Sequence, residues 1–142
     1  MREIKFRAWC NNEQYDFVEL TSYKDGSLGV SIATTGFSDL VSAPTETIIE
    51  QYTGLKDKNG VEIYEGDLVK LLISHKSHKN KVFKIIYSLG GFCLKIKDNA
   101  PTSIGLYFYE AVDNRVIDSW KDCDGSVFEV IGNIHENPEL IN

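Results

Sequence analysis

The sequence has little of what marks secreted, membrane-spanning or disulfide-stapled proteins. Its three cysteines, Cys10, Cys93 and Cys123, are an odd number and lie far apart, which excludes a disulfide framework. The segment from Met1 to Arg7 is charged and lacks the apolar centre of a signal peptide. No apolar run approaches the ~18 residues that a membrane-spanning helix needs. These absences predict a cytoplasmic protein with free thiols and no membrane partner.

Positive charge is also scarce. The chain of 142 residues carries 15 Lys and Arg against 21 Asp and Glu, a net charge of −6. Duplex DNA binding requires clustered cations, so this balance disfavours it for the molecule as a whole. The apolar content of 42% is that of an ordinary globular protein. We expect one domain over residues 1–142, with strands and a variable insert in 1–44 and a barrel-like core in 45–142.

Short strand signals separated by turn residues dominate the sequence. Residues 4–9 alternate between apolar and other residues, which predicts a half-buried strand, and residues 15–21 predict a strand that pairs back on it. The pairs Asn59-Gly60 and Gly90-Gly91 are hairpin signals. Further strands are predicted at residues 28–34, 47–53, 61–64, 68–74, 82–87, 92–97 and 127–134.

Two segments give weaker signals. Residues 35–46 are rich in Thr, Ser, Gly and Pro and are interpreted as a loop, and residues 104–120 fit either a strand or a helix. No βαβ alternation is visible, which indicates an all-β or β-rich α+β fold. We expect a small SH3-like barrel from about residue 45 onward, with the amino-terminal strands packed on it.

Three parts of the chain form a recognisable signature: residues 4–9 (Ile-Lys-Phe-Arg-Ala-Trp), the stretch 51–69 around Asp57-Lys58-Asn59-Gly60, and residues 129–140, which contain Gly-Asn-Ile-His-Glu-Asn-Pro. Together they resemble the YopX family of phage and prophage proteins. The function of that family is unknown. The resemblance implies a phage-derived, β-rich, self-associating protein of the bacterial host cytoplasm, and it transfers no catalytic residue. Residues 11–45 lie outside it.

The sequence shows no constellation of catalytic or metal-binding residues. His75 and His78 form a single H-x-x-H pair, whereas a structural zinc site needs two close pairs of ligands. The cysteines could pair with His75, His78 or His135 as nucleophiles, but no local nucleophile motif surrounds them. We therefore predict no catalytic residue, no metal, no cofactor and no enzymatic activity.

One basic stretch could bind nucleic acid. Residues 75–84 contain Lys76, Lys79, Lys81 and Lys84 beside Phe83, and no acid. Small barrels that bind single strands combine a charged groove with aromatic faces for base stacking, which makes these five residues the candidate site. The competing interpretation is a solvated lysine loop that protects a sheet edge from pairing.

Taken together, these observations favour a non-enzymatic phage accessory protein that acts as a binding or assembly module. We expect it to form a homo-oligomer and to have a phage or host protein as a possible partner. The first alternative is a single-stranded nucleic-acid-binding small barrel. The second alternative is an enzyme of unrecognised type.

Overall fold

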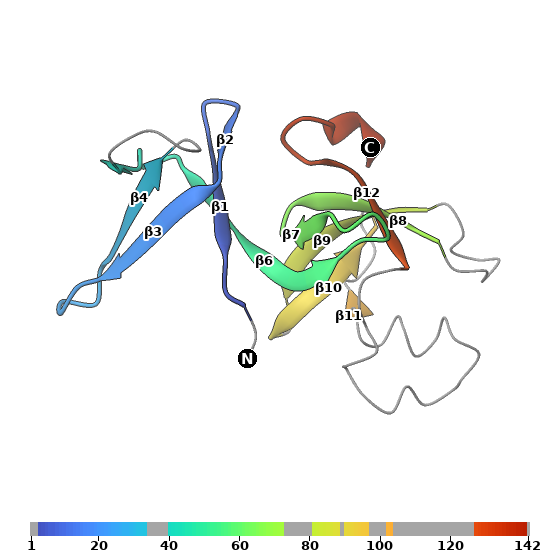
Figure 1. Ribbon diagram of the computed structural model, residues 1–142, viewed down its shortest axis with the longest axis horizontal. Helices are drawn as coiled ribbons and strands as arrows, with labels where there is room; N and C mark the ends of the chain where they lie inside the picture. Colours follow the sequence, from blue (N-terminus) through green and yellow to red (C-terminus); the bar gives the residue numbers. More distant parts are fainter. Residues whose placement is uncertain are drawn as a thin grey trace. The chain divides into compact units, whose positions relative to one another are not determined.

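A computed structural model describes residues 3–33, 40–72, 81–88, 90–96, 102–103 and 127–141. These residues form β-strands, turns and one short 3-10 helix, with no α-helix among them, which confirms the predicted β-rich fold. The chain divides into two compact units, Met1–Tyr52 and Thr53–Asn142, called the amino-terminal and carboxyl-terminal units below (Figure 1). The boundary lies inside a strand. The SH3-like detail of the barrel and the packing of the amino-terminal strands on it remain predictions.

The elements follow one another with short connections. The strands are β1 (Phe6–Cys10), β2 (Glu13–Tyr15), β3 (Phe17–Ser22), β4 (Leu28–Ala33), β5 (Val41–Ser42), β6 (Ile48–Lys56), β7 (Glu62–Tyr64), β8 (Asp67–Leu71), β9 (Val82–Ser88), β10 (Gly91–Lys95), β11 (Thr102–Ser103) and β12 (Phe128–Asn133), followed by the 3-10 helix η2 (Pro138–Leu140). Three sheets have the orders β2-β1-β6-β7, β11-β10-β9-β8-β12 and β3-β4-β5. Strand β6 crosses the boundary between the units.

Strand β1 is more buried than its alternating sequence predicts. It lies between β2 and β6, and every residue from Arg7 to Cys10 is buried. Arg7 stands directly opposite Glu50 of β6, and its Nε donates to Glu50 Oε2 at 2.7 Å. The indole Nε1 of Trp9 donates to the same oxygen at 3.1 Å. A carboxylate on the neighbouring strand thus allows the charged face of β1 to be buried, and the prediction of a half-buried strand was wrong.

The prediction for residues 15–21 was also wrong. Asn11 and Asn12 both have positive φ and form a tight turn, so the return strand β2 already begins at Glu13 and ends at Tyr15. The next strand, β3, pairs with β4 in a different sheet. The sequence pattern predicts one strand where the structure has two, because Asp16 is the only residue between them.

The carboxyl-terminal unit is built around one face of its five-stranded sheet. Adjacent strands place large apolar side chains on that face, where they pack against Ile63 of β7. The buried cluster consists of Ile63, Val69, Leu71, Phe83, Ile85, Leu94 and Phe128. Both predicted hairpins are present: Gly60 has φ +82° in the turn before β7, and Gly90 has φ +79° between β9 and β10. Residues 104–120 lie outside the described residues.

Candidate functional site

The three-stranded sheet of the amino-terminal unit carries a continuous apolar face. Opposite residues of an antiparallel pair project to the same side of a sheet. The register places Val18 opposite Ile32 and Leu20 opposite Val30, and it places Val41 of β5 opposite Ile32. Leu28 follows the same alternation along β4. We call the set Val18, Leu20, Leu28, Val30, Ile32 and Val41 the apolar face.

Two of the six residues of the apolar face are open to solvent. Leu28 is 60% exposed and Val41 is 59% exposed, while Val18, Leu20 and Val30 are half-buried and Ile32 is buried. The apolar face of an antiparallel sheet normally packs on a core. Figure 1 shows β3 and β4 side by side as a long hairpin. An apolar sheet face of this kind, left partly uncovered, is a candidate surface for binding another molecule.

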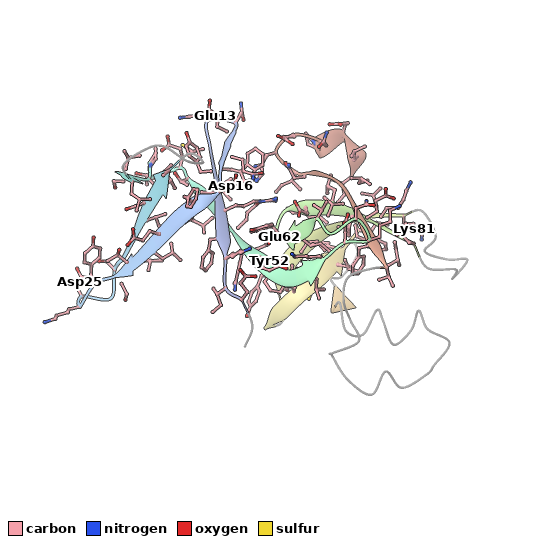
Figure 2. All side chains as sticks on the ribbon, viewed as in Figure 1. Glu13, Asp16, Asp25, Tyr52, Glu62 and Lys81 are labelled. Atoms are coloured by element: carbon pink, nitrogen blue, oxygen red, sulfur yellow. The ribbon has the colours of Figure 1, made fainter. Side chains whose placement is uncertain are left out.

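The part of the chain that contains the apolar face has more acids than bases. Residues 1–52 contain eight acids and four bases. Figure 2 shows Asp25 at the turn of the β3–β4 hairpin, beyond the ends of both strands. Its Oδ1 accepts hydrogen bonds from Ser27 Oγ at 2.6 Å and from the Ser27 amide at 2.9 Å, and these bonds hold the pKa of Asp25 below its ordinary value. The Asp25 carboxylate at the turn of the hairpin is therefore ionised at neutral pH, and its neighbour in the sequence is Lys24.

The residues predicted to bind nucleic acid occupy different environments. Lys81 is exposed just before β9 (Figure 2), and Lys84 is half-buried within that strand. Phe83 is only 3% exposed and belongs to the hydrophobic core, so its ring is not available for base stacking. The choice of Phe83 as a stacking residue was therefore wrong. Lys76 and Lys79 lie outside the described residues, and nucleic-acid binding by the stretch remains a prediction.

The two described cysteines are buried free thiols, Cys10 and Cys93. Burial raises the pKa of the Cys93 thiol above its ordinary value, and the hydrogen bond that its Sγ donates to the Ser88 carbonyl at 3.3 Å offsets this only in part. A protonated thiol is a poor nucleophile. Cys123 is outside the described residues.

The described residues contain no group of three or more His, Cys, Asp or Glu side chains that could hold a metal ion. They also contain no helix with the length and apolar character required to cross a bilayer.

Asp57 joins two segments that are far apart in the sequence. Its Oδ1 accepts hydrogen bonds from the amides of Asn59 and Val61, and its Oδ2 accepts one from the amide of Val130 in β12 at 3.0 Å. Burial raises the pKa of Asp57, but these three amides and the charge of Lys58 outweigh burial and lower it below its ordinary value. Asp57 is therefore a structural carboxylate that holds the β6–β7 turn against β12.

A second polar cluster closes the end of β12. Asn133 Oδ1 accepts hydrogen bonds from the amides of His135 and Glu136, and the Asn137 amide donates to the Asn133 carbonyl at 2.9 Å. A Cβ atom on Gly132 would lie 2.8 Å from Asn137 Cγ, so any other residue requires the Asn137 side chain to move. Sequence reasoning did not anticipate these roles. The sequence feature that could have indicated them is the presence of Asp and Asn near glycine at chain reversals.

Comparison with known proteins gives a consistent result. Residues 5–142 match the family model described as YopX protein. Protein EF1440 from Enterococcus faecalis is similar over 100% of both chains, with 28% sequence identity and a TM-score of 0.57. Protein YopX from Bacillus subtilis is also similar over 100% of both chains, with 19% identity and a TM-score of 0.60. No curated protein matches the chain.

Proposed function

Since the chain belongs to the YopX family, whose function is unknown, we propose from its exposed surface that it is a non-enzymatic binding and assembly module. It self-associates through the apolar face of β3, β4 and β5. The observation that carries this proposal is the exposure of Leu28 and Val41, at 60% and 59%, on a sheet face made of six apolar side chains.

A second copy of the chain is the occupant that this face fits best. Two identical sheet faces can stack about 10 Å apart with interdigitating side chains, as the layers of a β-sandwich do. A two-fold axis would place each apolar face on its counterpart. A second copy gains from the burial of Leu28 and Val41 on both sides of the interface.

The edge strand β3 supports the same proposal. Edge strands of monomeric proteins usually carry lysine, proline or a bulge that blocks further pairing. β3 has none of these: it pairs with β4 over six consecutive residues without a register shift, and its one charged residue is Glu19. This sheet is therefore poorly protected against association at its edge as well as at its face.

Size-exclusion chromatography with light scattering tests the proposal directly. The wild-type chain should have the mass of an oligomer at micromolar concentration and should dissociate on dilution. Leu28→Lys/Val41→Lys puts two like charges on each copy of the face, so this variant should be monomeric at the same concentration.

The matched control is Val61→Lys/Leu140→Lys, which changes two exposed apolar residues of the carboxyl-terminal unit by the same chemistry. It should keep the wild-type mass, and circular dichroism should show that both variants are folded. A wild-type protein that is monomeric up to about 100 μM, well above the Kd of a specific interface, would contradict self-association. If Leu28→Lys/Val41→Lys instead lost only a phage or host protein in a pull-down, the face would bind that partner and not a second copy.

A further inference from the structure

The carboxyl-terminal unit contains a long stretch without a single acid. Residues 68–97 include seven lysines and two histidines but no Asp or Glu, although the chain as a whole has more acids than bases. The stretch is therefore positively charged, whereas the chain as a whole is negatively charged. It contains nearly all of β8 and the whole of β9 and β10, three neighbouring strands of one sheet.

The strand register gathers three of these lysines on one face. Lys84 of β9 lies directly opposite Lys95 of β10, and on its other side it lies opposite Leu68 of β8. Lys70 is two residues beyond Leu68 and therefore projects to the same side. We call Lys70, Lys84 and Lys95 the lysine face. It is opposite the face that carries the core residues Val69, Phe83, Ile85 and Leu94.

Protection of a sheet edge does not explain these lysines. In the order β11-β10-β9-β8-β12, the strands that carry them are the three interior ones. Like charges directly opposite each other destabilise a sheet, so the Lys84–Lys95 pair has a cost that a neutral residue would avoid. No ion pair links any of the three to another described residue. The nearest cross-strand acid in the register is Glu129, which is opposite Lys70 but pairs with Lys58 Nζ at 3.1 Å.

We infer that the lysine face is a binding site for the sugar-phosphate backbone of single-stranded nucleic acid. Phosphate oxygens between Lys84 and Lys95 replace their mutual repulsion with attraction, and they release condensed counterions on binding. The contacts involve the backbone and not the bases, so binding is independent of sequence. The inference does not depend on self-association, which uses residues of the other unit.

The geometry favours a single strand over a duplex. All three lysines are half-buried, and Leu68 and Cys93 on the same face are buried. A flexible single strand can bring consecutive phosphates down onto half-buried ammonium groups, whereas a rigid duplex requires side chains that project. Three adjacent β-strands span only about 10 Å across the sheet. This width suits a few phosphates of one nucleic-acid strand.

Fluorescence anisotropy with a labelled oligothymidylate of about 20 nucleotides tests the site, with titrations at salt concentrations from about 50 to 200 mM. With three phosphate contacts, the logarithm of the association constant should fall with the logarithm of salt with a slope of about −2. Lys84→Gln/Lys95→Gln should reduce that slope to about −0.7 and weaken binding at low salt by about tenfold or more.

The matched control is Lys24→Gln/Lys56→Gln, which removes two exposed lysines from outside the lysine face and changes the net charge equally. It should bind like the wild type. Three results would overturn the inference: no binding at micromolar protein and low salt, equal loss in both double variants, or a polyglutamate peptide that competes as well as the oligonucleotide. Tighter binding of a duplex of the same length would overturn the assignment to a single strand.

Discussion

At the scale of single residues, Asp57 has the most consequential hydrogen bonds. Three backbone amides donate to one carboxylate that is 5% exposed, and one of them belongs to Val130, 73 positions away. Removal of a charged acceptor leaves buried donors unsatisfied. We predict that Asp57→Ala lowers the free energy of unfolding by about 3 kcal/mol. Urea denaturation measures this loss, and a change under about 0.5 kcal/mol would show that water replaces the carboxylate.

The lowered pKa of Asp57 also predicts a dependence of stability on pH. In the unfolded chain this carboxyl should titrate near pH 3.9, and in the folded protein at a lower pH. Its contribution is therefore fully present above about pH 4 and is lost as the pH falls through the folded pKa. Between about pH 6 and pH 2.5, the wild type should lose more unfolding free energy than Asp57→Asn, because Asn cannot titrate. Parallel pH profiles of the two proteins would contradict this account.

Gly132 gives a second prediction at the residue scale. Asn137 fills the space that a Cβ atom would need, so Gly132→Ala forces the Asn137 side chain away from the end of β12. We expect a loss of about 2 kcal/mol in the free energy of unfolding, typical of overpacking. In a double-mutant cycle, Asn137→Ala should recover part of that loss, because it removes the clashing atoms. Strictly additive losses would show that the two residues are not coupled.

At the scale of elements, the pairing of β1 with β6 depends on one carboxylate. Arg7 and Trp9 both donate to Glu50 Oε2, and the Arg7 guanidinium also lies 6.0 Å from the centre of the Trp9 ring. Loss of one partner from a buried ion pair costs about 3 to 5 kcal/mol. Glu50→Ala should therefore increase amide hydrogen exchange along β1. Glu50→Gln keeps an acceptor oxygen for both donors and should have a smaller effect. Unchanged protection of the β1 amides in Glu50→Ala would contradict this role.

At the scale of the whole molecule, the distribution of charge predicts opposite responses to salt. The amino-terminal unit has an excess of acids over bases, whereas residues 68–97 contain no acid. Added salt screens repulsion between two amino-terminal units of like net charge and weakens attraction to phosphates. Raising salt from about 50 to 500 mM should strengthen self-association and weaken oligonucleotide binding in the same preparation. If added salt strengthened both self-association and oligonucleotide binding, or weakened both, then either the apolar face or the lysine face would be wrongly assigned.

The sequence by itself determined the local features of the chain. Asn11-Asn12, Asn59-Gly60 and Gly90 form reversals because Asn and Gly tolerate positive φ, and this preference needs no distant partner. The positions of most strands and the β-rich class follow from the same local rules. The resemblance to the YopX family also follows from the sequence alone, because the segments of this chain that carry it contain several of these turn residues.

Only the tertiary structure decided which strands pair and which way each side chain points. A shift of one residue along a strand moves every side chain to the opposite face, and no local signal fixes that choice in β9, which has apolar residues at both odd and even positions. Phe83 therefore lies in the core although its sequence neighbours predicted a binding surface, and Lys84 meets Lys95 on the other side. The acceptor for the Val130 amide likewise comes from Asp57 across 73 positions, a distance that only long-range strand pairing can close.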